Sequence, residues 1–274
     1  FPDVLIVQGL YQFKPPFPFS PGSEISGVVS SVGEGVTMHK EGDRVMGSIG
    51  SGGLREKGVY LEQQLMPLPE TMDFNTAAGF PLNYGTTYHA FKQRGELKAG
   101  QSVLVLGAGG GLGITAIHIA KAMGAKVIAA ASSQEKIDLC KKEGADEGII
   151  YEREMDRDLQ KKFSDQIKEV TGGGVDMIYD LVGGDYAEPA LRAIARHGKY
   201  LVIGFTAGIP KMPLNLTLLK ECQIVGVFWG QFAGVEYAEN QQNFQELFDL
   251  HAEGKIKPFV TETYSLDESA TAIK

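Results

Sequence analysis

The sequence of 274 residues holds only two cysteines, Cys140 and Cys222, which lie far apart. Two isolated thiols exclude a disulfide scaffold and a zinc site built from several cysteines, and they suit a reducing compartment. No apolar run approaches the roughly 18 residues that a membrane-spanning helix needs, so no membrane span is expected. The net charge of −8 argues against a nucleic-acid partner. The remaining composition, 43% hydrophobic and 22% charged, is that of an ordinary globular protein.

A glycine-rich segment is the most informative feature that is present. The apolar run Val103–Leu106 is followed by the glycine cluster Gly107–Gly113, a helical pattern that stops at Gly124, and a second apolar run, Val127–Ala131. Such a β-α-β unit binds a dinucleotide, because its glycines bring main-chain N–H groups at the helix start close to the pyrophosphate. A tight turn without a ligand is the alternative. The residues expected to form this phosphate turn are Ala108, Gly110, Gly111, Leu112 and Gly113.

The end of the second apolar run indicates which dinucleotide binds. NAD sites usually place an Asp or Glu there, whereas this chain has Ala131 followed by Ser132, Ser133 and Lys136. Two hydroxyls and an ammonium accept a 2′-phosphate that a carboxylate would repel. Tyr151 closes the next strand-like run, and its hydroxyl is expected to reach the same phosphate. The sequence therefore favours NADPH over NAD, although a serine helix cap with a solvated lysine is compatible with the same residues.

A change of pattern near residue 75 predicts two domains. Residues 1–75 hold short β-like runs at Ile25–Val32, Arg44–Ile49 and Val59–Leu65 between glycines and prolines, which indicates a small β-rich domain. Residues 76–254 alternate helices and strands, which predicts an α/β fold with a doubly wound parallel six-stranded sheet of the Rossmann type. The strands are expected at 103–106, 127–131, 148–151, 175–181, 199–204 and 223–229, and the helices at 75–93, 112–123, 134–143, 155–171, 186–195 and 235–253. Residues 255–274 are β-like again and are expected to return to the first domain.

Short motifs spread over the whole chain carry a family resemblance. They are GLYQ at 9–12, PFSPGSEISGVV at 18–29, GDRVMG at 42–47, TAAGFPLNYGTTYHAF at 76–91, the glycine turn at 108–113, YDLVGG at 179–184 and GVFWG at 226–230. With them the chain resembles the zinc-independent quinone oxidoreductase branch of the medium-chain dehydrogenase/reductase superfamily. The resemblance implies that residues 1–75 belong to a GroES-like catalytic domain. It also implies about fifty further residues before Phe1 and a final helix and strand after Lys274. A cytoplasmic location is expected, and a mitochondrial one stays open.

The same resemblance implies that no metal is bound. Ser23 stands where the zinc alcohol dehydrogenases have a ligating His, and residues 1–21 and 50–65 contain no Cys where their other ligands would fall. A tetrahedral zinc site needs four converging ligands. Glu24 is expected either to pair with a basic group or to be a surface acid beside a strand.

Without a metal, reduction of a conjugated acceptor is the expected chemistry. Charge that develops in a quinone or an enone spreads over the conjugated system, so one hydrogen bond to the oxygen suffices. The resemblance implies Tyr11 as the donor, since a Tyr in the matching motif is the proposed proton donor of enoyl-thioester reductases. A cleft-lining aromatic is the alternative. Tyr84 is implied as a second residue of the substrate cleft, and Thr86 as a contact of the nicotinamide carboxamide.

Residues after the later strands are implied as further cofactor contacts, because ligands of doubly wound sheets lie beyond the carboxyl ends of the strands. Gly204, Phe205 and Thr206 are expected near the nicotinamide ribose. Phe228 and Trp229 are expected near the nicotinamide or the substrate, with an interface as the alternative for Trp229. Asp180 is expected to be structural.

The sequence thus predicts an NADPH-dependent oxidoreductase that transfers hydride to a small quinone or another α,β-unsaturated carbonyl. An enoyl-CoA or enoyl-ACP reductase is one alternative, and an NADPH-binding protein without catalysis, similar to lens crystallins, is another. The apolar run Cys222–Phe228 is the last strand of the series and is expected at a sheet edge. By resemblance, two copies would join their sheets there as a homodimer. A monomer with a covered edge is the alternative.

Overall fold

The computed structural model describes residues 2–11 and 13–273, and the chain forms two compact units. The first unit comprises residues 1–82 and 258–274, and the second comprises Asn83–Lys257. The boundary between the units therefore falls within one helix, α3 (Pro81–His89). No helix of the described residues combines the length and the apolar character that crossing a bilayer requires.

The first unit contains a small antiparallel sheet. Its strands β1 (Glu24–Val28), β2 (Arg44–Ser48) and β3 (Leu65–Pro67) pair in the order β1-β2-β3. Gly47 lies in the central strand, close to the helical turn that leads into β3. A Cβ atom on Gly47 would come within 2.2 Å of the Gln64 carbonyl oxygen in that turn. The helices of this unit are short, and they are α1 (Pro2–Val7), η1 (Glu62–Gln64), α2 (Phe74–Ala78), η4 (Leu266–Glu268) and α11 (Ser269–Ile273).

Two predictions for this unit are wrong. The third strand was expected at Val59–Leu65, but Val59 is 100% exposed and the strand covers Leu65–Pro67. Residues 255–274 were expected to be β-like, whereas those of them that the structure describes contain helical turns and no strand. An alternating sequence becomes a strand only where a neighbouring strand accepts its backbone hydrogen bonds and its apolar face is buried.

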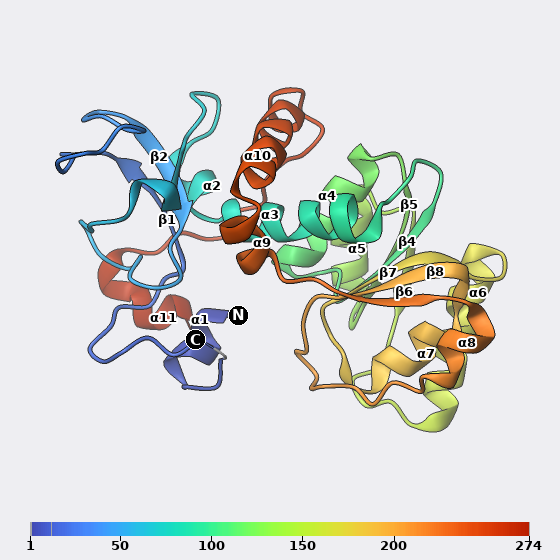
Figure 1. Cartoon of the computed structure of the whole chain (residues 1–274). Coiled ribbons are helices and arrows are strands. Elements are labelled where there is room, and N and C mark those ends of the chain that lie inside the picture. The colour runs from blue at the N-terminus through green and yellow to red at the C-terminus, as the bar shows by residue number, and fades with distance from the viewer. Residues whose placement is uncertain (1, 12, 274) are drawn as a thin grey trace. The chain divides into compact units, whose positions relative to one another are not determined.

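The second unit is a doubly wound α/β domain, as predicted. Its six strands are all parallel and follow the order β6-β5-β4-β7-β8-β9. The strands are β4 (Ser102–Leu106), β5 (Lys126–Ala131), β6 (Glu147–Ile150), β7 (Val175–Asp180), β8 (Ile194–Val202) and β9 (Gln223–Gly226). The longer helices are α4 (Gly111–Ala122), α5 (Gln134–Lys142), α6 (Arg157–Thr171) and α10 (Tyr237–Ala252), and the shorter ones are α7 (Ala187–Arg192), α8 (Asn215–Lys220) and α9 (Trp229–Val235). Within this unit, α4 and α5 cover one face of the sheet and α6, α7 and α8 cover the other (Figure 1).

The central strands form because their side chains are apolar on both faces. Every residue of Val103–Leu106 is fully buried, as is every residue of Val127–Ala130. Helices on both sides of a parallel sheet demand such continuous apolar runs. The core under α6 and α7 includes Phe163, Leu191 and Tyr200.

The expected single helix over 75–93 is divided in the structure. α2 ends at Ala78, Gly79 follows as its C-cap, and α3 starts with Pro81, whose fixed φ and missing N–H suit the first position of a helix. A π-helical turn, η2 (Ala90–Gly95), continues α3. At the other end of the sheet, β9 stops at Gly226 rather than at 229, because Trp229 already begins α9.

Candidate functional site

The parallel sheet collects six loops at one edge of the second unit. Since all strands run the same way, the segments that follow them meet at the carboxyl edge, and the strand order reverses direction between β4 and β7. Ligands of open α/β sheets bind at this switch point. The site is therefore built from the residues that follow β4 and its neighbours.

The glycine turn between β4 and α4 is tied down at its start. Gly107 has a φ of +77°, and the N–H groups of Gly107 and Ala108 both donate to the Ala130 carbonyl at the end of β5, at 3.1 and 3.0 Å. A Cβ atom on Gly113 would lie 2.4 Å from the Ala108 carbonyl oxygen, so the first turn of α4 packs on the loop only with glycine there.

The outer side of the turn is open. Cβ atoms on Gly110 and Gly111 would meet nothing closer than 3.6 and 3.7 Å. Gly110 is the N-cap of α4 and supplies no side-chain acceptor to the N–H groups of the first turn. Leu112 lies in that turn. Uncapped N–H groups at the start of a 12-residue helix form an anion-binding site.

The residues after β5 lie beside this turn. Ser133 is the N-cap of α5, where its Oγ accepts the Lys136 N–H at 3.3 Å. The stem of Lys136 packs against Gly109, because a Cβ atom on that glycine would be 2.9 Å from Lys136 Cβ. Ser132 is half-buried between them and the strand, and the Lys136 side chain is exposed. Ser133 therefore caps α5 while the Lys136 side chain lies beside the glycine turn, so the two interpretations of this segment are compatible.

Tyr151 follows β6 and lies against the start of the glycine turn. Its N–H donates to the Ala131 carbonyl at 3.0 Å, and its ring centroid is 4.7 Å from that of Tyr186. Burial raises the pKa of Tyr151 to about 12, while a hydrogen bond with the backbone of Gly107 acts in the opposite direction.

The loops after β7 and β8 are held by one buried carboxylate. Asp180 Oδ1 accepts the N–H groups of Val182 and Gly183 at 2.8 and 2.9 Å, and its Oδ2 accepts the Tyr200 hydroxyl at 2.6 Å. Burial raises the pKa of Asp180, and these three hydrogen bonds oppose the rise. The structural role expected for Asp180 is confirmed.

Three predicted residues lie together in the β8 loop. The Gly204 N–H donates to the Asp180 carbonyl at 3.2 Å, and the Thr206 N–H and hydroxyl both donate to the Leu181 carbonyl at 3.3 Å. Phe205 between them is 40% exposed. The topology brings this loop to the same edge as the glycine turn.

Phe228 and Trp229 differ in exposure. Phe228 is 67% exposed at the end of the β9 segment. Trp229 is 5% exposed, and its Nε1–H donates to Asn240 Oδ1 in α10 at 2.9 Å. The indole fills the space over Gly85, where a Cβ atom would come within 2.5 Å of it. Nothing in the sequence indicated this packing of Trp229 between α3 and α10.

The α3 residues lie behind the turn. Tyr84 is 2% exposed, and its hydroxyl contacts His118 Nδ1 at 3.2 Å. His118 Nε2 contacts Glu143 Oε2 at 2.9 Å, so that the three side chains form a chain of hydrogen bonds. Burial raises the pKa of Tyr84 strongly. Thr86 is half-buried on the same helix. No sequence spacing links His118 to Tyr84 or Glu143, so its place in this chain of hydrogen bonds was not predictable.

Tyr11 and Ser23 lie in the first unit. Tyr11 is half-buried in the turn after α1. The buried Ser23 donates its hydroxyl to Asp3 Oδ1 at 2.7 Å and to the Gly50 carbonyl at 3.3 Å. Across the described residues, no group of three or more His, Cys, Asp or Glu side chains could hold a metal ion.

The contact that the structure shows for Glu24 is a third arrangement. Its carboxylate accepts the Leu82 N–H at the start of α3 at 2.7 Å, so this partner is a backbone amide. Burial raises the pKa of Glu24 to about 7. The Leu82 hydrogen bond opposes this rise, and the nearby Asp3 adds to it.

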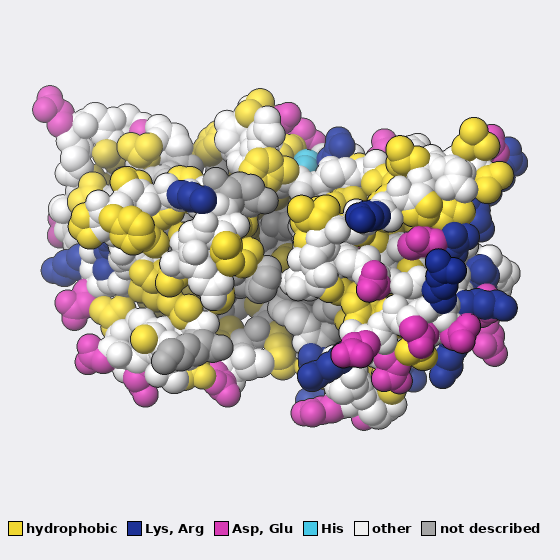
Figure 2. All heavy atoms as spheres, turned by 90° about the horizontal axis from the view of Figure 1, so that it is seen from below, with side chains coloured by type: hydrophobic (Ala, Val, Ile, Leu, Met, Phe, Trp, Pro, Cys, Tyr) yellow, Lys and Arg dark blue, Asp and Glu magenta, His cyan; other side chains and the backbone are white. Residues whose placement is uncertain are grey.

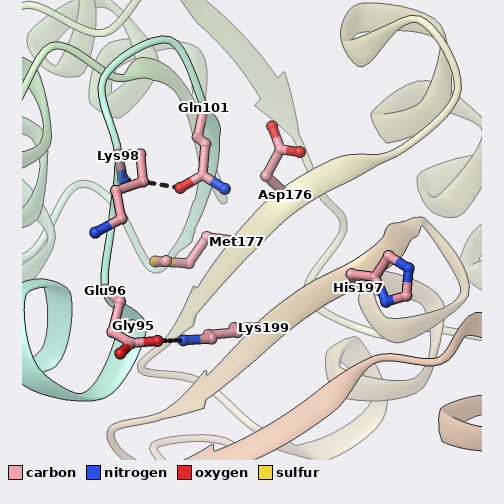
Figure 3. A pocket seen from close by; sticks show the side chains of 8 residues that line it. All are labelled: Gly95, Glu96, Lys98, Gln101, Asp176, Met177, His197 and Lys199. Atoms are coloured by element: carbon pink, nitrogen blue, oxygen red, sulfur yellow. Dashed lines mark hydrogen bonds and ion pairs between the residues drawn. The ribbon is translucent and has the colours of Figure 1, made fainter.

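A hollow of about 300 Å³ lies at the amino ends of the strands, away from the glycine turn. Its lining residues are Gly95, Glu96, Lys98, Gln101, Asp176, Met177, His197 and Lys199. Lys199 is paired with Glu96, and Asp176 Oδ2 accepts the N–H and the hydroxyl of Ser102, each at 2.8 Å. Figure 3 shows Lys98 and His197 pointing away from each other. The charged groups of this hollow do not point toward a common centre, so the carboxyl edge of the sheet is the stronger candidate for the functional site.

Comparison with known proteins identifies relatives along the whole chain. Residues 1–70 match the model of the alcohol dehydrogenase GroES-like domain, and residues 111–253 match that of the zinc-binding dehydrogenases. Quinone oxidoreductase-like protein 2 of Bos taurus is 36% identical over 270 residues, which cover 98% of this chain and 76% of that protein.

Two similar structures were solved with NADPH. Escherichia coli quinone oxidoreductase complexed with NADPH matches with a TM-score of 0.88 and 31% identity, over 99% of this chain and 82% of that one. A mycobacterial protein complexed with NADPH matches with a TM-score of 0.90 and 28% identity, over 100% of this chain and 83% of that one.

Proposed function

Because the chain belongs to the quinone oxidoreductase branch of the medium-chain dehydrogenase/reductase superfamily, we propose that it is an NADPH-dependent reductase of quinones or other α,β-unsaturated carbonyls that works without zinc. The observation that carries the proposal is the open glycine turn with the Lys136 stem packed along it, at the switch point of the sheet. The two related structures that contain NADPH support it.

The residues of the carboxyl edge fit a bound NADPH. Gly110, Gly111 and Leu112 would offer N–H groups to the pyrophosphate, and Ala108 and Gly113 keep the turn close to α4. Ser132, Ser133, Lys136 and Tyr151 would surround the 2′-phosphate. The two residues directly after β5 are serines, and the first acidic residue, Glu135, follows in the first turn of α5.

The nicotinamide half would lie along the later loops. Gly204, Phe205 and Thr206 are proposed for the ribose, Thr86 for the carboxamide, and the exposed ring of Phe228 for the nicotinamide face. No cofactor contact is proposed for the Trp229 ring, since it is buried over Gly85. NADPH supplies a hydride when it is bound.

The acceptor oxygen needs one hydrogen-bond donor, and Tyr11 is proposed for this role. A hydride and one proton together convert a quinone to a hydroquinone, and Tyr11 would deliver that proton and then be reprotonated by solvent. The Tyr84 hydroxyl is held by His118 inside the second unit, so we assign it packing rather than proton donation. Ser23 is engaged with Asp3, and it has no imidazole with which to bind zinc as the alcohol dehydrogenases do.

Steady-state kinetics test the proposal. NADPH oxidation at 340 nm with 1,4-benzoquinone should saturate with both substrates. Tyr11→Phe should lower kcat by about a hundredfold or more, within the range of general-acid contributions. Tyr60→Phe removes another half-buried hydroxyl of the first unit, which donates to the Gly52 carbonyl, and should leave kcat unchanged.

The alternatives give different results in the same assay. Tight NADPH binding without turnover of any acceptor would indicate a protein without catalysis. Turnover of crotonyl-CoA in preference to quinones would indicate an enoyl reductase. Such an enzyme needs a basic patch for the pantetheine-phosphate arm, whereas on the coloured part of the face in Figure 2 the Lys and Arg side chains alternate with Asp and Glu.

A further inference from the structure

Tyr186 holds the segment that follows Tyr151, although the two lie far apart in the sequence. It ends the short turn η3 (Gly184–Tyr186) after β7 and is 7% exposed. Its hydroxyl lies within hydrogen-bond distance of two backbone carbonyls, those of Glu152 at 2.9 Å and Arg153 at 2.8 Å, which share its one proton. One side chain from the segment after β7 thus contacts two successive peptide units of the segment after β6, which we call the β6 loop.

The ring of Tyr186 also fixes the side chain of Tyr151. The two ring centroids are 4.7 Å apart with an interplanar angle of 54°, and Tyr151 packs edge-on against Phe163 of α6 at 5.9 Å. The Tyr151 N–H is bonded to the Ala131 carbonyl. Tyr151 is therefore restrained through its backbone and on two sides of its ring.

The hydroxyl of Tyr186 is not needed to satisfy the two carbonyls. Glu152 and Arg153 are exposed residues on the surface of the unit, where water competes for backbone carbonyl groups. The hydrogen bonds instead limit the freedom of a loop that would otherwise be mobile. A purely space-filling tyrosine would act as well without its hydroxyl.

From these contacts we infer that Tyr186 is a positioning residue for 2′-phosphate recognition: it orders Tyr151 and the Glu152–Arg153 segment so that this corner of the site discriminates NADPH from NADH. The inference rests on the proposed function, because it assumes that Tyr151 and Lys136 face the 2′-phosphate. Arg153 adds a positive charge to the segment that Tyr186 holds. No contact of Tyr186 itself with the cofactor is assumed.

The test is the binding of both dinucleotides to Tyr186→Phe by isothermal titration calorimetry. The variant keeps the ring and removes only the hydroxyl. The Kd for NADPH should rise about three- to tenfold, the effect of a lost hydrogen bond, while the Kd for NADH should change less than twofold. The kcat with saturating NADPH should be unchanged.

Tyr179→Phe is the matched control. Tyr179 lies in β7, is fully buried, and its hydroxyl is 2.9 Å from Thr87 Oγ1, away from the β6 loop. It should leave the ratio of the two Kd values as in the wild type. If Tyr186→Phe fails to fold, Arg153→Gly and Arg153→Ala replace it. Glycine makes the backbone of this segment more flexible than alanine does, so Arg153→Gly should reproduce the selective loss of NADPH binding relative to Arg153→Ala.

The outcomes separate the inference from the proposed function. An equal rise for both dinucleotides, or no rise for either, in Tyr186→Phe overturns the inference. If Lys136→Ala still shows the selective loss of NADPH, the cofactor assignment survives that result. A wild-type protein that binds NADPH and NADH equally overturns both.

Discussion

Lys136 lies in the first turn of α5, where the Ser133 hydroxyl accepts its backbone N–H. The aliphatic part of its side chain packs along Gly109. Its stem is thereby fixed, and its exposed ammonium has little freedom to lose when an anion binds. A charge-assisted hydrogen bond contributes about 1.5–3 kcal/mol. We expect Lys136→Ala to weaken NADPH binding by about tenfold or more and to leave NADH nearly unchanged, as measured by calorimetry.

Lys142→Ala is the control for this variant, since it removes the same charge from the last turn of α5. It should alter neither Kd by more than about twofold, because an exposed charge further from the phosphate is screened. Equal losses of NADPH and NADH binding in Lys136→Ala would show that the lysine does not face the 2′-phosphate.

Glu24 gives the protein a pH dependence of its own. Burial raises its pKa from 4.5 to about 7, so the folded chain holds this proton more tightly than the unfolded chain does. Protonated Glu24 therefore contributes its full stabilisation of the folded state below about pH 4.5, and this contribution is lost as the pH rises to about 7. At 1.36 kcal/mol for each pKa unit, the difference between 4.5 and about 7 corresponds to about 3 kcal/mol.

Glu24→Gln should remove this part of the pH dependence while it keeps an acceptor for the Leu82 N–H. In denaturant unfolding, the variant should match the wild type at pH 4.5 and be more stable than it at pH 8. Glu41→Gln, an exposed carboxylate of the same unit, serves as control. A wild-type stability that does not fall between these pH values relative to Glu24→Gln would contradict the buried-carboxyl account.

At the scale of elements, how well the fold could be predicted depended on burial. Most strands of the second unit were predicted closely because apolar runs such as Val103–Leu106 are buried on both faces, but β8 begins at Ile194, within the helix predicted at 186–195. The run at Val59–Leu65 and the β-like pattern of residues 255–274 misled, since a strand also needs a neighbour that no sequence pattern specifies. Gly79 and Pro81 are typical of a helix end and a helix start, but one helix was predicted to run through both.

The candidate site was predictable to the extent that topology alone assembles it. Parallel strands bring the glycine turn, the serine–lysine segment, Tyr151 and the β8 loop to one edge, whatever the side chains do. Which way a helical side chain faces was not predictable: Tyr84 turns to His118, and Trp229 turns to Gly85 and Asn240. Tyr186 left no signal because its partners are backbone carbonyls.

The position of β9 at the edge of the sheet is confirmed, and the homodimer remains a prediction. Ile224 and Val225 are half-buried there, and the neighbouring α8 exposes Leu218 and Leu219 at 76% and 69%. An edge of this kind pairs readily with another copy. We expect a dimer at micromolar concentration in sedimentation velocity, and Val225→Asp should convert it to a monomer.

The opposite edge provides the control for the dimer. Ile150 of β6 is 42% exposed, and Ile150→Asp places the same charge on that edge strand. That variant should remain dimeric. A wild-type protein that sediments as a monomer would refute the dimer without affecting the cofactor assignment.

At the scale of the whole molecule, the chain combines a doubly wound α/β unit with a GroES-like unit, in which Ser23 stands where the family resemblance places a zinc-ligating His. Activity should therefore survive prolonged treatment with EDTA or 1,10-phenanthroline, and elemental analysis should find no stoichiometric zinc. Activity that is lost on chelation and restored by zinc would mean that other residues supply the ligands.

The central claim is that the chain transfers hydride from NADPH to a quinone. Its most direct test is anaerobic incubation of NADPH with 1,4-benzoquinone and the purified protein, with NADP⁺ and hydroquinone measured by chromatography against a protein-free control. The account predicts one hydroquinone for each NADPH consumed, at a rate proportional to protein concentration and greater than with NADH. A rate equal to the protein-free control, in a sample that binds NADPH in calorimetry, would contradict it.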